Sequence, residues 1–314
     1  MKCFILIDGN AILHRAYHAL PPLTDRSGNL INAAYGFSTM LLRVIDDLKP
    51  DYLAVAFDRS EPTFRHMEYL GYQSQRPEMA EDLSGQIEKV HEIVEAFGIP
   101  IYSLSGFEAD DVIGTLASQA TKGLAASRSP LEVIIVTGDR DIMQLVNENI
   151  KVYAPVRGMS ETEMFDPEKV TEKMGVKPSQ IVDYKGLVGD PSDNYPGVLG
   201  IGPKTASDLL KKYQTLENIY QHLDELSETV AKKLAEGKDL ALLSQKLARI
   251  VTNAPVDLDI EKCRFDFTSE EKKNVAEKFS ELGFKSLSGR LIGNPKTEKP
   301  KNSKIRNEGQ GGLF

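Results

Sequence analysis

The 314-residue chain has two cysteines, no tryptophan and no long apolar run. Cys3 and Cys263 are too few for a disulfide framework or a Cys-rich zinc site, and we expect both to be small core residues. The longest apolar runs, such as residues 4–7 and 133–136, are too short to cross a bilayer. The N-terminus lacks the features of a signal peptide. We therefore expect a cytoplasmic protein with no membrane contact.

The overall composition is that of a folded globular protein. Hydrophobic residues make up 41% of the chain and charged residues 27%, which excludes a collagen-like or fully disordered chain. At roughly 150 residues per domain, the length indicates about two domains. The 38 basic and 46 acidic residues give a net charge of −8, which at first argues against nucleic acid as a partner. However, we expect nine of the carboxylates to lie in one site, and without them the net charge changes from −8 to +1. The net charge therefore does not exclude nucleic acid as a partner.

The first half of the chain alternates short apolar runs with stretches of helical spacing. The expected strands are residues 4–7, 52–57, 101–104, 133–136 and 151–153. The expected helices are residues 11–17, 33–48, 87–97 and one that begins near 109–111. Continuous apolar strands separated by helices are typical of a parallel sheet that is covered on both faces. This pattern predicts an α/β core over residues 1–176.

From about Lys177 the pattern changes to short helices, which we expect at residues 205–213, 230–234 and 239–250. This helical region extends to about residue 293. Residues 294–314 are rich in Lys, Asn, Gly and Pro, and we expect them to form a disordered basic tail.

Carboxylates recur at the expected strand ends. Asp8, Asp58 and Asp139 each follow an apolar strand, at the edge of a parallel sheet where sites form. Six further acids fall close to these positions along the chain: Glu108, Asp110, Asp111, Asp141, Asp190 and Asp193. Ligands that offer only oxygen suit Mg²⁺ or Mn²⁺ better than zinc or copper. Two such ions can activate a water and stabilise the leaving oxygen of a phosphodiester.

Each piece of this pattern also has a structural explanation. A lone Asp after a strand is often a turn or helix-capping residue, and the acids at 108–111 also suit a helix N-terminus. Asp190 and Asp193 alone fit an Asx-turn around Pro191. Together, however, nine acids in one region repel each other, which is costly unless cations bind among them. The combined pattern therefore favours a metal site.

Two further segments carry features of nucleic-acid binding. The glycines of residues 197–205 allow a tight hairpin whose backbone N–H groups reach a phosphate, although a plain glycine turn fits nearly as well. The candidate contacts there are Gly197, Gly200, Gly202, Lys204 and Thr205. Residues 64–76 interleave basic and aromatic side chains, which suits single-stranded nucleic acid; a solvated loop with two packed tyrosines is an equal alternative.

These motifs together resemble the flap endonuclease superfamily, specifically the 5′→3′ exonuclease domain of bacterial DNA polymerase I. The resemblance covers residues 4–292 and is carried by IDGNAILHRAYHA, AVAFD, FRHMEYLGYQSQR, GFEADDVIGTLA, VTGDRDIMQLV and GLVGDPSDNYPGVLGIGPKTA. It implies a PIN-like core with a helical arch near residues 60–97, followed by a helix–three-turn–helix region that grips duplex DNA and binds K⁺. All nine acids match the ligands of two divalent ions.

The resemblance also implies residue roles and an activity. The catalytic candidates are Asp8, Asp58, Asp111, Asp139 and Arg76, and the candidates for guiding the 5′ strand are Arg15, Arg65, Tyr72, Gln73 and Arg76. The implied activity is 5′→3′ exonuclease and 5′-flap endonuclease action on DNA and RNA primers by a monomer in replication and repair. The rival interpretations are a PIN-like ribonuclease and a DNA-binding tethering protein without catalysis.

The sequence departs from the family at two places. Gln73 stands where the family arch usually has a lysine, which predicts reduced turnover. No proofreading or polymerase domain follows, so we expect a stand-alone nuclease or a piece of a longer chain. The last five residues resemble a short motif that binds the bacterial sliding clamp, with Gln310, Leu313 and Phe314 as its anchors.

Overall fold

The computed structural model of the protein describes residues 2–125, 131–159 and 161–292. Its centre is a six-stranded sheet with the order β3-β2-β1-β4-β5-β6. The strands are β1 (Lys2–Asp8), β2 (Tyr52–Ala56), β3 (Ile101–Tyr102), β4 (Leu131–Val136), β5 (Ile150–Arg157) and β6 (Glu161–Phe165). Every strand pair is parallel except β5–β6, which is antiparallel. The predicted α/β fold with a mainly parallel sheet is confirmed.

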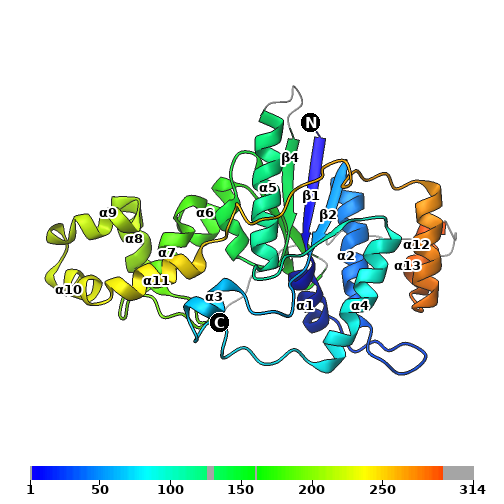
Figure 1. Ribbon diagram of the computed structural model, residues 1–314, viewed down its shortest axis with the longest axis horizontal. Helices are drawn as coiled ribbons and strands as arrows, with labels where there is room; N and C mark the ends of the chain where they lie inside the picture. Colours follow the sequence, from blue (N-terminus) through cyan, green and yellow to red (C-terminus); the bar gives the residue numbers. More distant parts are fainter. Residues whose placement is uncertain (1, 126–130, 160, 293–314) are drawn as a thin grey trace, which may run out of the picture.

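Helices cover both faces of this sheet because its strands are apolar on both sides. In β1, Phe4 and Leu6 face one core and Ile5 and Ile7 face the other, as the two-residue period of a strand requires. On one face lies α5 (Ala109–Ala125), and on the other lie α1 (Gly9–Ala19), α2 (Asn32–Leu48) and α4 (Glu81–Ala96) (Figure 1). The cores on both faces hold the strand ends in fixed positions, and these ends carry the site.

The antiparallel strand β6 was not predicted. Its sequence, Glu-Thr-Glu-Met-Phe, is mainly polar, and only Phe165 is buried, so it carries no apolar run. It pairs with β5 at the edge of the sheet, where one side of a strand needs no partner. Edge strands are therefore harder to predict from hydrophobicity than the buried strands β1 and β4.

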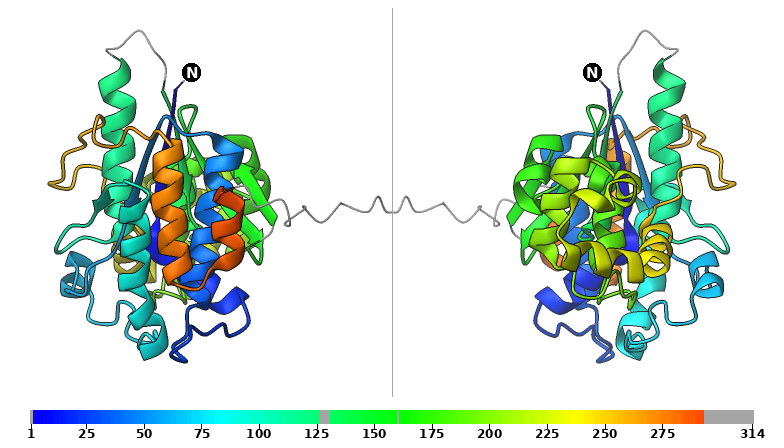
Figure 2. Two further views of the ribbon diagram at one scale, coloured as in Figure 1. Left: turned by 90° about the vertical axis from the view of Figure 1, so that its right-hand side faces the viewer. Right: turned by 90° about the vertical axis from the view of Figure 1, so that its left-hand side faces the viewer.

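The helical part of the chain lies in two separate places (Figures 1 and 2). At one end of the molecule are α6 (Pro167–Met174), α7 (Ile181–Val188), α8 (Pro203–Tyr213), α9 (Leu216–Gln221), α10 (Glu228–Glu236) and α11 (Lys238–Ala248), with the short 3₁₀ turns η2 (Pro178–Gln180) and η3 (Leu223–Glu225). At the other end, α12 (Ser269–Glu281) and α13 (Lys285–Ile292) pack beside α2 and α4. The chain thus returns to the core after α11.

The segment expected to form an arch is only partly helical. Within the predicted range of residues 60–97 lie the five-residue helix α3 (Phe64–Glu68), a run of turns over residues 69–76, an extended stretch over residues 77–80 and the helix α4. Figure 1 shows residues 64–80 passing from the helical end of the molecule to the N-terminal end of α4. None of the helices in the described ranges is long and apolar enough to cross a membrane. The predicted tail over residues 294–314, with Gln310, Leu313 and Phe314, lies outside the described residues.

Candidate metal centre

The carboxyl ends of the central strands and the start of α5 open into one cleft of about 660 Å³. Seven of the nine predicted acids line it: Asp8, Asp58, Glu108, Asp110, Asp139, Asp141 and Asp193. The other two, Asp111 and Asp190, lie close by but do not line the cleft. The prediction that acids from strand ends and from the helical half of the chain meet in one place therefore agrees with the structure.

A chain of hydrogen bonds fixes the acids that follow β1 and β4. Asp8 ends β1 and caps α1, because its Oδ1 accepts from the Ala11 amide at 2.9 Å. Its Oδ2 accepts from the Thr137 hydroxyl at 2.7 Å, and the Thr137 Oγ1 accepts in turn from the Asp139 amide at 2.9 Å. Asp139 Oδ1 then accepts from the Asp141 amide at 2.8 Å. These bonds position the carboxylates of Asp8 and Asp139, and each bonded oxygen retains a lone pair that can bind a cation.

Asp58 and Glu108 are held at the start of α5. Asp58 Oδ1 accepts from the Ala109 amide at 2.6 Å, at the positive end of the helix. The backbone amide of Asp58 donates to Asn10 Oδ1 at 2.9 Å, which ties the end of β2 to α1. Glu108 accepts from the hydroxyls of Thr63 at 3.3 Å and Tyr72 at 3.2 Å. Residues from the expected arch therefore reach the cleft.

The pKa values of these acids show the cost of placing them together. Burial raises the pKa of Asp8 to about 7 and that of Glu108 to about 7; hydrogen bonds to Asp8 and the Arg65 guanidinium beside Glu108 oppose the rise, and neighbouring carboxylates add to it. Burial raises the pKa of Asp110 well above its usual value, and the charges of Asp139 and Asp8 add to this. Burial also raises the pKa of Asp58, against the opposing Ala109 amide. A bound cation would relieve this cost.

A second acidic group comes from the helical half of the chain. Asp141, Asp190 and Asp193 each offer a carboxylate oxygen, and these three oxygens lie within 4.8 Å of one another. The loop that carries Asp190 and Asp193 is closed where Gly189 and Gly197 cross: a Cβ at Gly197 would lie 2.2 Å from the Gly189 amide nitrogen. Both glycines have positive φ angles, of 72° and 62°.

Lys185 is an unpredicted part of this second group. Its buried ammonium donates to the carboxylates of Asp141 and Asp190, the latter at 2.5 Å. Burial acts against ionisation of Asp190, but the Lys185 ammonium outweighs it and lowers the pKa of Asp190. The available signal was a lysine in the mainly apolar helix α7, which contains one other charged residue, Asp183, because a buried ammonium needs anionic partners.

Asp111 does not fit the predicted role of metal ligand. It is fully buried, and its two oxygens accept from Arg65 Nη1 and Nη2 at 2.7 and 2.8 Å. They also accept from the backbone amides of Val251 at 2.8 Å and Glu108 at 3.1 Å. With these four bonds its oxygens are used. Asp111 is the buried counter-ion of Arg65, which also lies 3.2 Å from a carboxylate oxygen of Glu108.

The same contacts correct the prediction for Arg65. Its guanidinium is buried rather than free to guide a 5′ strand, and beyond Asp111 it donates to the carbonyls of Leu247 and Arg249, each at 2.9 Å. Tyr72 is also buried, and its ring stacks on Tyr195 with centroids 6.5 Å apart and planes 13° from parallel. For Tyr72 the packed-tyrosine alternative is correct, so its ring faces are not open to a base.

The remaining arch candidates meet Asp193. Arg76 Nη2 donates to Asp193 Oδ1 at 2.5 Å, and Gln73 Nε2 lies 3.4 Å from the same oxygen. The Arg76 side chain is about half exposed, so it can also reach a ligand in the cleft. Arg15 lies on a neighbouring opening, beside Asp139 and the Gly158 carbonyl to which it donates at 3.2 Å.

The hairpin candidates lie away from the acidic cleft. Gly202, Lys204 and the tip residue Gly200 are exposed, and α8 begins there at Pro203; Thr205 is half-buried in its first turn. Gly197 differs, because the backbone of residues 188–189 occupies the space beside it. A glycine is needed at position 197 because two backbone segments cross there, and not because a phosphate approaches it. This corrects the prediction that Gly197 contacts phosphate.

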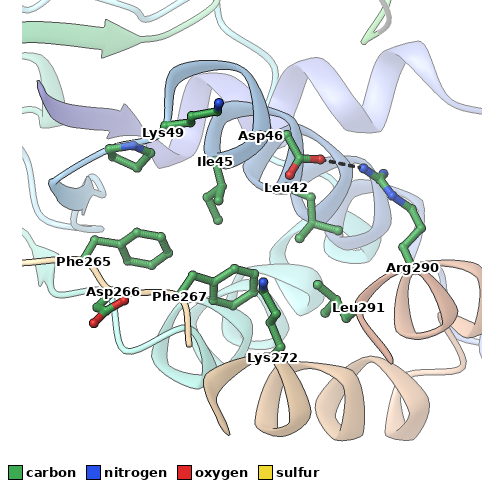
Figure 3. A pocket seen from close by; sticks show the side chains of 11 residues that line it. Leu42, Ile45, Asp46, Lys49, Phe265, Asp266, Phe267, Lys272, Arg290 and Leu291 are labelled. Carbon is green, nitrogen blue, oxygen red and sulfur yellow. Dashed lines mark hydrogen bonds and ion pairs between the residues drawn. The ribbon is translucent and has the colours of Figure 1, made fainter. Parts of the chain in front are cut away.

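A separate pocket of about 430 Å³ lies between α2 and the C-terminal helices (Figure 3). Its apolar walls include Phe265 and Phe267, and its rim holds the ion pair of Arg290 and Asp46, at 3.1 Å. Two acids line this pocket, and one of them is already paired. The pocket therefore offers no counterpart to the carboxylate cluster.

The donor atoms of the acidic cleft suit divalent cations. Its candidate ligands are all oxygens, which is what Mg²⁺ and Mn²⁺ prefer, and it contains no cluster of nitrogen or sulfur ligands among the described residues. The raised pKa values of Asp8, Glu108 and Asp141, each about 7, show that the folded chain alone does not fully compensate these charges.

This electrostatic arrangement predicts an unusual pH dependence of stability. Asp8, Glu108 and Asp141 have pKa values of about 7 in the folded protein and about 4 when unfolded. Between these values the folded state binds more protons, so stability falls as the pH rises. We expect the melting temperature in EDTA to fall by at least about 2 °C between pH 5.5 and 8, and Mg²⁺ to restore it at pH 8.

Thermal unfolding in EDTA, followed by circular dichroism at each pH, measures this effect. The pKa of Asp190 is lowered, so this residue titrates below the interval and does not contribute to it. A melting temperature that rises with pH in EDTA would contradict the prediction.

The sequence matches one family over most of its length. Residues 3–175 match the 5′-3′ exonuclease N-terminal resolvase-like domain, and residues 176–271 match the 5′-3′ exonuclease C-terminal SAM fold. The chain is 43% identical to DNA polymerase I of Caldicellulosiruptor bescii over 290 residues, and 40% identical to that of Bacillus subtilis over 291 residues. These matches cover 91% and 92% of the chain, and the chain spans about a third of the length of these relatives.

Two solved structures share the fold. The T5 D15 protein co-crystallised with metal ions has a TM-score of 0.65 at 15% identity, covering 93% of this chain and 99% of that one. The catalytic core of Rad2 in complex with DNA substrate has a TM-score of 0.59 at 17% identity, covering 93% and 92%. Because the family match includes both the sheet core and the helical region, the chain is a nuclease that belongs to the 5′-3′ exonuclease family.

Proposed function

We propose that the chain hydrolyses phosphodiester bonds at 5′ ends and 5′ flaps of DNA with two divalent cations, Mg²⁺ or Mn²⁺. The observation that carries this proposal is the convergence of seven carboxylates on one cleft. When bound, such a pair of cations activates a water and stabilises the leaving oxygen. The T5 D15 and Rad2 structures, which contain metal ions and DNA substrate respectively, support the same assignment.

The chain's own residues divide into two proposed ligand groups. The first contains Asp8, Asp58, Glu108, Asp110 and Asp139, and the second contains Asp141, Asp190 and Asp193. Asp111 is left out because its oxygens already bind Arg65 and two backbone amides. Hydrogen bonds from backbone amides orient the carboxylates of Asp8, Asp58, Asp139 and Asp190 before a cation arrives, which lowers the cost of ordering them.

Cationic groups around the cleft are placed to hold the DNA. Arg76 reaches the cleft from the arch, and Arg15 of α1 lies on the neighbouring opening; both can bind phosphate oxygens of the 5′ strand. The exposed hairpin before α8, with Gly200, Gly202, Lys204 and Thr205, is proposed to hold the duplex phosphates and a K⁺ ion. We further propose that residues 1–176 form the nuclease core and that the helical region begins at residue 177.

The proposed substrates are nicked DNA, 5′ flaps and RNA primers, which places a monomer of this nuclease in replication and repair in the cytoplasm. The C-terminal residues Gln310, Leu313 and Phe314 are proposed to bind a sliding clamp. Deleting residues 310–314 should then abolish capture by immobilised clamp protein, and retained capture would reject this part.

A gel assay on a 5′-labelled flap duplex tests the proposed activity. We expect release of the flap with Mg²⁺ or Mn²⁺, none with EDTA, and none with an Asp139→Ala variant in any metal. A single-stranded RNA of the same sequence distinguishes the ribonuclease alternative. Binding of the duplex without cleavage in both metals would instead support a tethering protein.

We expect a substitution at Gln73 to raise the nuclease activity. Its amide lies 3.4 Å from Asp193 Oδ1, at the point where Arg76 also enters the cleft. A lysine there would add a second cation beside the path of the phosphate. We expect Gln73→Lys to raise the single-turnover rate by about tenfold, because a positioned charge stabilises the transition state more than the ground state.

Gln75→Lys is the matched control, because Gln75 lies exposed in the same segment and gains the same charge. Rapid-quench measurement with enzyme in excess gives the single-turnover rate for all three proteins. An equal gain in both variants would mean that only overall charge matters, and no gain in Gln73→Lys would reject the prediction.

A further inference from the structure

Tyr195 carries a buried hydroxyl that the proposed function does not yet use. The residue is 3% exposed, and its hydroxyl has no hydrogen-bond partner. Among the described residues only one other buried side-chain polar atom, His91 Nε2, lacks a partner. A buried hydroxyl without a partner costs about 1–3 kcal/mol, so its retention calls for an explanation.

The backbone holds Tyr195 directly against the second acidic group. Its amide donates to the Asp190 carbonyl at 3.1 Å, and the Asp190 amide donates to the Tyr195 carbonyl at 2.8 Å. The ring is fixed by its stack on Tyr72. Burial raises the pKa of Tyr195, the positive charge of Lys185 opposes this rise, and the charges of Asp141 and Asp190 add to it. Tyr195 is therefore paired through its backbone with Asp190, the residue that Lys185 binds, and its hydroxyl lies within electrostatic range of the ammonium.

Lys185 occupies the oxygens that a cation would need. Its ammonium donates to Asp141 and Asp190, two of the three residues whose oxygens meet within 4.8 Å. Arg76 pairs with the third, Asp193. When all three carboxylates are ionised, the two positive side chains leave one negative charge of the group uncompensated. A divalent cation entering this group competes with the ammonium, and a buried ammonium that loses its acceptors carries a large penalty.

We propose that the Tyr195 hydroxyl oxygen is the alternative acceptor for Lys185 when a divalent cation binds Asp141, Asp190 and Asp193. The ammonium then exchanges carboxylate acceptors for the hydroxyl, and no proton is transferred. Tyr195 is in this sense a positioning residue that acts through Lys185. The inference rests on the proposed function, because it presumes that this acidic group binds a cation.

Manganese binding in the absence of DNA tests the proposal without using activity. Free Mn²⁺ is measured by electron paramagnetic resonance, and the sites that Asp193→Asn loses define the second group. We expect Tyr195→Phe to weaken binding at these sites by about tenfold, the effect of one hydrogen bond to a charged group. In a Lys185→Met background the same substitution should have no effect. Lys185→Gln serves as this background where Lys185→Met does not fold.

Two controls separate this role from a structural one. Tyr195→Phe removes a hydroxyl that has no partner, so its melting temperature in EDTA should not fall below that of the parent protein. Tyr184→Phe, on the neighbouring helix α7, makes the same chemical change and should leave Mn²⁺ affinity unchanged. A purely structural tyrosine would show the opposite pattern, with lower stability and unchanged affinity.

Each other outcome has a distinct meaning. Unchanged Mn²⁺ affinity in Tyr195→Phe overturns the proposal while leaving the nuclease assignment intact. A loss of affinity that persists in the Lys185→Met background also overturns it, because the hydroxyl would then act on the cation directly. If the parent protein binds no Mn²⁺ at all, the proposed two-cation function itself fails.

Discussion

Replacing Asp110 with asparagine is expected to reduce 5′-flap cleavage at least about a thousandfold and to stabilise the metal-free protein. Asp110 lies in the first turn of α5 and lines the cleft. Burial and then the charges of Asp139 and Asp8 raise its pKa well above the usual value. A neutral amide removes both the repulsion and a proposed cation ligand. A thousandfold corresponds to about 4 kcal/mol, within the several kcal/mol that metal ions contribute to such reactions.

The two effects have opposite signs, which makes the experiment decisive. Single-turnover cleavage and thermal unfolding in EDTA are measured on the same preparations. Asp257→Asn is the control, because it makes the same charge change at an exposed position. If Asp110→Asn lowered stability and kept activity, the acids of the cleft would be structural, and the proposed function would lose its support.

The sheet and the acidic cleft could be predicted because both depend on local patterns. Buried parallel strands are apolar without interruption, so β1 and β4 are visible in the sequence, and an acid at the end of each is visible with them. Parallel strands bring their carboxyl ends to one edge, which places Asp8 and Asp139 together without further information. Asp190 and Asp193 of the helical half were also visible as an acidic pair, and the family resemblance supported their interpretation as ligands.

The details that were missed depend on contacts between distant segments. Asp111 is adjacent to Asp110, yet it does not line the cleft, and Arg65 and the Val251 amide use its oxygens. Nothing in the local sequence distinguishes these two neighbouring acids. The glycine at 197 likewise looks like a phosphate-binding residue, while the structure shows it to be required by its crossing with Gly189. Tertiary packing decides both cases.

Replacing Arg65 with alanine is expected to destabilise the protein by about 3–5 kcal/mol, because it leaves the Asp111 carboxylate buried without its counter-ion. The guanidinium also donates to the carbonyls of Leu247 and Arg249 at the end of α11. It thereby connects α3, α5 and α11, three elements that come from distant parts of the sequence. Denaturant unfolding monitored by circular dichroism measures the change.

A double-mutant cycle shows whether the pair or the packing is responsible. Asp111→Ala removes the buried charge, so adding it to Arg65→Ala should recover part of the lost stability. The remaining cost is that of the cavity and of the two unpaired carbonyls.

Arg59→Ala is the matched control, because this exposed arginine lies in the same segment and donates to the Ser103 hydroxyl at 3.2 Å. Equal stabilities of Arg65→Ala and Arg59→Ala would show that the ion pair contributes little. Asp111 would then again be a candidate metal ligand, and other contacts, such as those of Tyr72 with Glu108 and of Arg76 with Asp193, would hold the arch in place.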